Sequence, residues 1–373
     1  MQSLLATLAG VIGALALAEA SLRLAGYSAG NPYDRLLNHN DEYVGYRMLP
    51  GARETIGGPD GVYGVEIVSL GFDDGRGFRD DGRQEPVHSL FFGDSFVWGY
   101  GVEIDDGIVE QFEALTGRDA VNLGMTSFTS PTQYARLFAE YGPRFRADYA
   151  FFGLFLGNDF GDSRNFADWL LTGQAISYPE WRTRQIRGME VSSATVGLRL
   201  FAYRNSALYR FVSDRMQFAL SGARTRESGT DVAEIRTGPL DLVLDRREIV
   251  ADLGADGARQ IELVEAALRD IARVARASGT HPVFFVIPTR ELVYQSLFPE
   301  PADRDAQDVR HGLLLGMLAD LGLDHVDLLP VFREAVANGA PQLYFRVDGH
   351  WKPAGHALAA AALLRHVEAD ARD

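Results

Sequence analysis

The chain has 373 residues, enough for one large α/β domain or for one such domain plus insertions, and its 46% hydrophobic and 23% charged content is typical of a globular protein. Its formal net charge of −15 argues against nucleic acid as a partner, because phosphate binding requires clustered Lys and Arg. The absence of cysteine excludes thiol nucleophiles and Cys-based zinc sites, and the eight histidines show no metal-ligand spacing. We therefore expect neither a metal nor another cofactor.

Residues 1–26 are predicted to form an N-terminal membrane segment. Residues 4–18 carry no charge, and the apolar character continues past Glu19 to Ala25. A span needs about 20 residues, so an uncleaved signal anchor is favoured. A cleaved signal peptide is the alternative, supported by small-x-small triplets such as Ala16-Leu17-Ala18. A buried amphipathic helix is the remaining possibility.

Residues 27–86 are dense in Gly, Pro, Asp and Asn, with brief alternating segments such as 62–68. This pattern predicts a linker followed by short β segments packed on the main domain. We can assign no chemistry to it.

The main domain is predicted to occupy residues 87–373 and to alternate strands with helices. Buried strands are expected at 89–92, 120–123, 149–156, 282–287 and 325–328. Helices are expected from Asp105 or Asp106 to about 116, and near 131–141, 258–277, 308–321 and 357–366. This rhythm predicts a three-layer α/β/α fold, flavodoxin-like, around a parallel five-stranded sheet.

Residues 160–255 interrupt the rhythm and are predicted to be a mainly helical insertion. Aromatic and arginine residues are interleaved at 181–184 and 201–210, and 221–229 is small and polar. The insertion follows the third strand, which places it near the strand ends. A lid over a site and a packing or oligomer contact are equally compatible with this placement.

Polar residues follow several of the predicted strands, at the edge where ligands bind in open α/β sheets. Ser95 follows the first strand, Gly124 the second and Asn158 the third, while Asp348 and His350 come near the end of the chain. His350 is a candidate base for a nucleophilic Ser95, with Asp348 as the group that orients the imidazole. The amides of Ser95 and Gly124 and the side-chain amide of Asn158 are candidate oxyanion donors.

Four sequence blocks carry a resemblance to a known family. The blocks are Gly93-Asp94-Ser95-Phe96, 122–124, 157–159 and 348–351, in that order. They resemble the signature blocks of the SGNH (GDSL) hydrolase superfamily, which supply the nucleophile, two oxyanion donors, and the base with its acid. Residues 288–294, the ending 348–356 and the apolar N-terminus are more similar to membrane-anchored SGNH-like proteins related to alginate O-acetyltransferases. In those proteins the acid and histidine can precede the serine, whereas here they follow it.

The resemblance and the site residues together predict an SGNH-type enzyme that acts on ester bonds. We expect a serine esterase that cleaves an O-acyl ester, carried by a cell-envelope carbohydrate, through an acyl-Ser95 intermediate. A polysaccharide O-acetyltransferase with the same site and a catalytically silent carbohydrate-binding or assembly protein are the alternatives. The expected location is an extracytoplasmic, periplasmic domain on a membrane anchor, or a secreted protein after signal cleavage.

Overall fold

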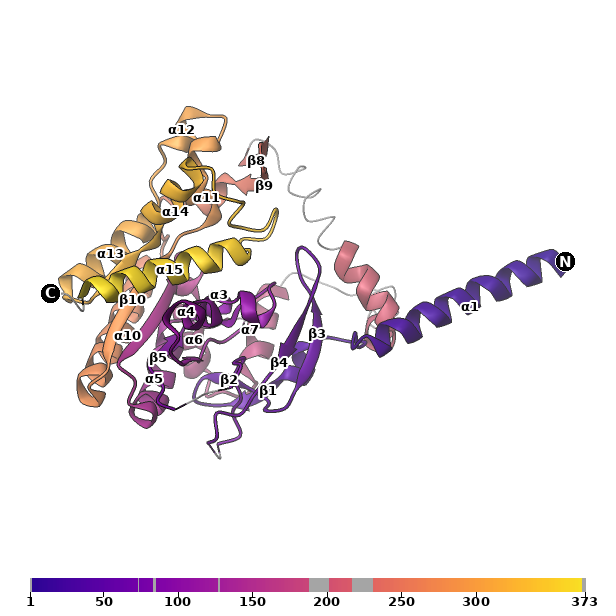
Figure 1. Cartoon of the computed structure of the whole chain (residues 1–373), viewed down its shortest axis with the longest axis horizontal. Coiled ribbons are helices and arrows are strands. Elements are labelled where there is room, and N and C mark those ends of the chain that lie inside the picture. Colours follow the sequence, from indigo (N-terminus) through magenta and orange to yellow (C-terminus); the bar gives the residue numbers. More distant parts are fainter. Residues whose placement is uncertain are drawn as a thin grey trace.

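A five-stranded parallel sheet organises the computed structural model, which describes residues 2–72, 74–82, 85–126, 128–187, 201–216 and 231–370 (Figure 1). The strand order is β11-β10-β7-β5-β6. The bounds are β5 (Ser89–Phe92), β6 (Ala120–Asn122), β7 (Tyr149–Phe155), β10 (His281–Ile287) and β11 (His325–Asp327). All neighbours pair in parallel, so every carboxyl end lies at the same edge.

Phenylalanines from three neighbouring strands make up the centre of the sheet. The rings of Phe92 and Phe152 stack at 5.0 Å, and those of Phe152 and Phe284 at 5.2 Å. All three residues are fully buried. Strands covered on both faces need continuous apolar runs of this kind, and the sequence provides them.

Helices cover both faces of the sheet and make the fold three-layered. On one face α5 and α6 pack against α10; on the other α4 packs against α15. The strand order explains this division. The connection from β5 to β6 leads toward one edge of the sheet, whereas the later connections, from β6 to β7 to β10 to β11, lead toward the other edge. Because such connections are right-handed, the two directions place their helices on opposite faces of the sheet. The bounds are α4 (Ile108–Thr116), α5 (Pro131–Phe145), α6 (Asp159–Leu171), α10 (Gly257–Ser278), α13 (Val309–Asp320), α14 (Leu328–Ala337) and α15 (Pro353–Asp370). The α/β/α fold expected from the sequence is confirmed.

Short helices lie in the loops that connect the strands with the longer helices. They are α3 (Ser95–Trp98), η1 (Ile104–Asp106), η3 (Arg246–Glu248), α11 (Arg290–Val293), η4 (Gln295–Leu297) and α12 (Pro301–Arg304). Two of them, α3 and α11, begin at the carboxyl edge of the sheet, where they bring Ser95 and Arg290 to the surface of the core.

The segment before the sheet contains two hairpins and one short helix. Their bounds are α2 (Tyr33–Leu36), β1 (Leu37–Asp41), β2 (Gly45–Met48), β3 (Arg53–Gly57) and β4 (Val62–Glu66). The buried guanidinium of Arg79 joins them to the turn after β5, because it donates to the carbonyl oxygens of Gly64 at 3.2 Å and Trp98 at 3.0 Å. The indole nitrogen of Trp98 also lies 3.3 Å from the sulfur of Met48. These segments therefore support the helix that begins at Ser95.

The N-terminal helix α1 (Gln2–Leu24) extends away from the rest of the protein (Figure 1). Its residues Leu5–Leu24 are long and apolar enough to cross a membrane, a property shared by signal anchors and signal peptides. The last turns of α1 contact the body, because the Glu19 carboxylate accepts from the backbone amides of Ala207 at 3.0 Å and Leu208 at 2.8 Å.

The segment between β7 and β10 combines helices with a hairpin. It contains α6, α7 (Tyr178–Arg187), helical residues 201–205 and 207–216, and the strands β8 (Val232–Thr237) and β9 (Leu240–Asp245). The sequence led us to expect helices here, and the antiparallel pair β8–β9 was not foreseen. The small, polar stretch 221–229 lies outside the described residues, and the role of the insertion as lid or contact stays a prediction.

Candidate active site

Ser95 lies in the sharp turn between β5 and α3. It is the first residue of α3, and Asp94 caps this helix by accepting from the amide of Phe96 at 3.0 Å. The turn requires glycine before it, since a Cβ on Gly93 would lie 2.3 Å from Cγ2 of Val97. As the first residue of a helix, Ser95 has no intrahelical acceptor for its own amide. The turn thus exposes both a hydroxyl and a backbone N–H.

His350 and Asp348 complete a chain of hydrogen bonds that starts at Ser95. The hydroxyl Oγ of Ser95 lies 2.7 Å from Nε2 of His350. On the other side of the ring, Nδ1 lies 2.5 Å from Oδ1 of Asp348, which also accepts from the backbone amide of His350 at 2.9 Å. The structure therefore brings together the three residues expected to form a triad.

The loop that carries His350 folds back on itself as a tight pair of segments. Tyr344 and Trp351 form an antiparallel bridge, and the amide of Phe345 donates to the oxygen of His350 at 3.0 Å. The rings of Phe96 and Tyr100 both pack against the imidazole, with centroid distances of 4.9 and 4.5 Å. This packing fixes the plane of the ring.

Charges around the imidazole favour its protonated form. Burial lowers the pKa of His350, but the charge and hydrogen bond of Asp348, assisted by the charge of Asp94, outweigh burial and raise the pKa above its ordinary value. Burial likewise raises the pKa of Asp348, yet His350 outweighs it and lowers the pKa of this carboxyl. Asp348 is therefore suited to stabilise an imidazolium.

Arg290, which we did not single out from the sequence, holds the His350 loop from behind. Its Nη1 donates to the carbonyl oxygens of Arg346 and Asp348, both at 3.2 Å, and its Nη2 lies 2.6 Å from Oε1 of Glu291. Arg290 and Glu291 are buried, at 6% and 2% exposed. The sequence does contain a signal for this role, because Arg290 and Glu291 are adjacent charged residues shortly after a predicted buried strand.

Gly124 lies beside the nucleophile turn, but its amide is already engaged. The N–H donates to Oδ1 of Asn122 at 2.9 Å, and Nδ2 of Asn122 donates to the oxygen of Val97 at 3.0 Å. A Cβ on Gly124 would meet the backbone nitrogen of Trp98 at 2.7 Å. In this structure the Gly124 amide secures the turn through Asn122, and its expected role as an oxyanion donor stays a prediction.

Asn158 lies in the cavity next to His350, at the position that precedes α6. Within the described part of the chain, its Oδ1 is buried without a hydrogen-bond partner. The neighbouring Asp94 is fully buried, and burial raises its pKa to about 6 against the opposing effects of Phe96, His350 and Asn158. Asn158 and Asp94 are therefore two polar residues close to Ser95.

Two other polar residues near the site have structural contacts. Asp159 accepts from the amide of Phe155 at 2.9 Å and from the Tyr134 hydroxyl at 3.1 Å, which joins β7 to α5. His356 is buried with its ring edge-on to Trp351, and burial lowers its pKa to about 3. It is therefore a neutral packing residue.

A cavity of about 350 Å³ opens beside the triad. Its lining includes Phe96, Asn158, Asp348 and His350, as well as Val243 and Asp245 of β9 together with Glu248, Arg290 and Glu291. The hairpin is fastened to the His350 loop, because the amide of Val243 donates to the oxygen of Arg346 at 2.8 Å. The unforeseen hairpin is thus a wall of the candidate site.

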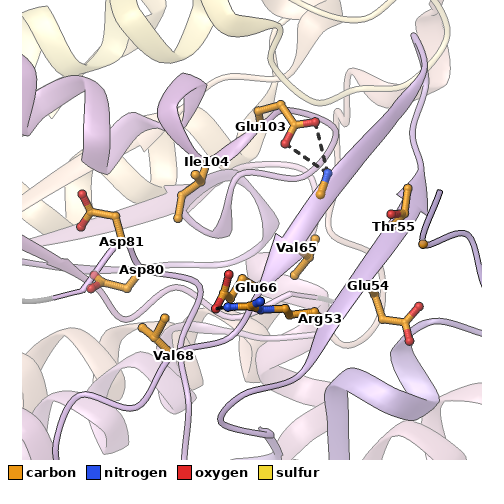
Figure 2. A pocket seen from close by; sticks show the side chains of 12 residues that line it. Arg53, Glu54, Thr55, Val65, Glu66, Val68, Asp80, Asp81, Glu103 and Ile104 are labelled. Atoms are coloured by element: carbon orange, nitrogen blue, oxygen red, sulfur yellow. Dashed lines mark hydrogen bonds and ion pairs between the residues drawn. The ribbon is translucent and has the colours of Figure 1, made fainter. Parts of the chain in front are cut away.

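A second hollow of about 510 Å³ lies along the β3–β4 hairpin (Figure 2). Its lining is rich in carboxylates, but Glu66 pairs with Arg53, and both oxygens of Glu103 accept from the amide of Gly64. None of the triad residues lines it. Among the residues described by the structure, no group of three or more His, Asp or Glu could hold a metal ion.

One family model matches the part of the chain that carries the base of the candidate triad. The family model of the SGNH hydrolase-like domain of the acetyltransferase AlgX matches residues 248–373, which include Arg290, Asp348 and His350. The C-terminal third of the chain is therefore similar to the SGNH hydrolase-like domain of AlgX, in line with the resemblance carried by the sequence blocks. A search of the curated proteins finds no match.

Several solved structures are similar to the chain at low sequence identity. A member of the lipolytic protein G-D-S-L family from Veillonella parvula DSM 2008 is 13% identical, with a TM-score of 0.36, and covers 75% of this chain and 97% of its own. A mutant of Axe2, an acetyl-xylooligosaccharide esterase from Geobacillus, is 13% identical with a TM-score of 0.38, covering 75% and 94%. The acetyl xylan esterase AlAXEase is 10% identical with a TM-score of 0.38, covering 75% and 100%.

Proposed function

We propose that the protein is a serine acyl hydrolase that cleaves an O-acyl ester, carried by a cell-envelope carbohydrate, through an acyl-Ser95 intermediate. The observation that supports this proposal is the uninterrupted chain from Ser95 through His350 to Asp348, at 2.7 and 2.5 Å. A serine hydroxyl becomes nucleophilic only when a base takes its proton, and an imidazole needs an orienting acceptor to do so.

In the first half of the reaction, Oγ of Ser95 attacks the acyl carbonyl carbon while Nε2 of His350 takes the hydroxyl proton. The tetrahedral oxyanion is stabilised by the backbone amide of Ser95 and the side-chain amide of Asn158. The bond between the acyl carbon and the sugar oxygen then breaks, and His350 returns its proton to the departing sugar hydroxyl. Asp348 keeps the ring oriented and stabilises its positive charge.

In the second half, water attacks the acyl-Ser95 carbonyl after giving a proton to His350. The bond to Oγ breaks, Ser95 recovers its proton from His350, and the free acid leaves. If a sugar hydroxyl replaces water, the same steps transfer the acyl group to a carbohydrate. The similarity of residues 248–373 to the AlgX domain favours this O-acetyltransferase as the second candidate.

We place the catalytic domain outside the cytoplasm, held at the membrane by α1. The support for this location is the exposed apolar stretch Leu5–Leu24, which extends away from the body. A secreted protein, released after cleavage near Ala18, would present the same catalytic domain without the anchor.

The test is release of acetate from an aryl acetate by the full-length protein in detergent, compared with Ser95→Ala. We expect turnover that requires Ser95, with acetate as the product in buffer alone. Added oligosaccharide that becomes acetylated at the expense of free acetate would identify a transferase. Equal rates for wild type and Ser95→Ala would overturn the acyl-enzyme mechanism and favour a carbohydrate-binding or assembly protein.

A further inference from the structure

The charges that line the candidate cavity are paired, with one exception. Asp348 is bonded to His350, and Glu291 to Arg290. Asp245 accepts from Nε of Arg247 at 2.9 Å. The exception is Glu248, at the end of the short helix η3, whose carboxylate has no hydrogen bond or ion pair within the described ranges of the chain.

The single arginine of the lining is not available to bind a negative charge. Besides its pairing with Glu291, the Arg290 guanidinium donates to the carbonyl oxygens of Phe345, Arg346 and Asp348. As far as the described lining goes, the cavity therefore presents one free carboxylate and no free cation to whatever enters it.

The carboxylate of Glu248 is a hydrogen-bond acceptor to which no described residue donates. Its side chain is exposed at the cavity, yet partial burial of the carboxyl raises its pKa, and Glu291 and Asp245 contribute to the rise while Arg310 and Arg290 oppose it.

We propose that Glu248 is a specificity-determining residue that selects an electrically neutral, hydroxyl-rich carbohydrate as the carrier of the acyl group. Sugar hydroxyls can donate charge-assisted hydrogen bonds to its carboxylate. A uronate or other acidic sugar would instead bring a second negative charge into a cavity that holds no cation to neutralise it. The inference rests on the proposed function, because it assigns the substrate class of the same site.

Discrimination by a single like charge near the surface should amount to about tenfold in kcat/KM, since ion–ion energies at partly solvated sites are of the order that produces this ratio. The effect should appear mainly in KM, because Glu248 contacts the sugar rather than the reacting carbonyl. Glu248→Gln should reduce the preference for the neutral sugar, and Glu248→Arg should reverse it.

The experiment compares O-acetylated xylo-oligosaccharides with O-acetylated oligogalacturonates of matched length, and measures acetyl release by wild type, Glu248→Gln and Glu248→Arg. Glu262→Gln, which changes an exposed carboxylate on α10 outside the cavity, is the matched control and should keep the wild-type ratio. Melting curves of all four proteins verify that they fold.

Two results would overturn the inference while leaving the proposed function intact. They are a neutral-to-acidic ratio that stays the same in both Glu248 variants, and wild-type turnover of an aryl acetate with no turnover of either oligosaccharide. A wild-type protein that cannot cleave even the aryl acetate would instead overturn the proposed function, and this inference with it.

Discussion

Arg290 lies on the far side of the triad from Ser95, with its Nη1 3.2 Å from the backbone oxygen of Asp348. One buried guanidinium thereby fixes the segment from Phe345 to Asp348 at three carbonyl oxygens. Hydrogen bonds to a charged donor are about twice as strong as neutral ones, so the loop has little freedom to move. The position of the His350 ring thus depends on a guanidinium that donates to the backbone of the loop rather than to the triad side chains.

Arg290→Gln should lower kcat by roughly 10- to 100-fold with little change in KM, because a shift of about 1 Å in the base suffices for a loss of that size. Steady-state kinetics on an aryl acetate measure this. Arg290→Lys should recover little, since an ammonium cannot span three carbonyls in the geometry of a guanidinium.

Arg333→Gln is the matched control for Arg290→Gln. Arg333 also donates to a backbone carbonyl, that of Leu292, at 2.9 Å, but it does not contact the His350 loop. If both variants lose the same share of kcat, the loss reflects general stability and Arg290 has no special positioning role.

The pH profile of kcat/KM should have an acidic limb with an apparent pKa above 6.5. A base must be neutral to accept a proton, and the charges of Asp348 and Asp94 raise the pKa of His350 above that ordinary value. Activity is therefore lost as pH falls through the raised pKa. An acidic limb below pH 6 would contradict the assigned base.

Asp94→Asn should move this acidic limb to lower pH. With its pKa of about 6, Asp94 is mostly ionised where His350 titrates, so its removal takes away a charge that favours imidazolium. The Asn side chain keeps an oxygen to cap Phe96. Asp162→Asn, which changes a buried carboxylate paired with Arg182 at 2.9 Å, should leave the limb in place. Equal shifts of the acidic limb in both variants would show that Asp94 has no specific effect on the pKa of His350.

Asn158→Ala should slow turnover by roughly 10²- to 10³-fold, the usual cost of losing one oxyanion donor. The effect belongs in kcat, because the oxyanion exists only in the transition state. Binding of a boronic acid that mimics the tetrahedral state should weaken in parallel. An unchanged kcat would leave the Ser95 amide as the sole donor proposed.

Phe152→Ala should destabilise the fold by about 3 to 5 kcal/mol, because it leaves a cavity in the centre of the sheet. The ring of Phe152 lies 5.0 Å from that of Phe92 and 5.2 Å from those of Phe138 and Phe284. Urea denaturation followed by circular dichroism gives the free energy of unfolding. Leu171→Ala, at a side chain 78% exposed, should change it by less than about 0.5 kcal/mol.

Local patterns in the sequence were sufficient to predict the sheet and the polar residues at its edge. Runs such as 149–156 are apolar and continuous, which is typical of strands buried on both faces. Because parallel strands share one carboxyl edge, the positions of Ser95 and Asn158 followed from the order of elements alone.

Features that depend on contacts between distant segments could not be predicted in this way. The β8–β9 hairpin lines the cavity, and its Val243 amide donates to the oxygen of Arg346, a residue far away in the sequence. The roles of Arg290 and Glu248 depend on a hairpin and a loop far away in the sequence. Periodicity and spacing within one sequence do not indicate which residue a buried charged side chain will pair with.

The bond between Ser95 and His350 joins residues 255 positions apart, one following β5 and the other following β11, and these two strands lie on either side of the pairing between β7 and β10. Residues up to β7 provide the nucleophile, and residues from β10 onward provide the base, so neither portion of the chain holds a working site. Turnover therefore depends on the pairing of β7 with β10, which holds these two portions of the sheet together. In mild denaturant, activity should disappear while most helical signal persists, because a slight separation at this seam disconnects the serine from its base.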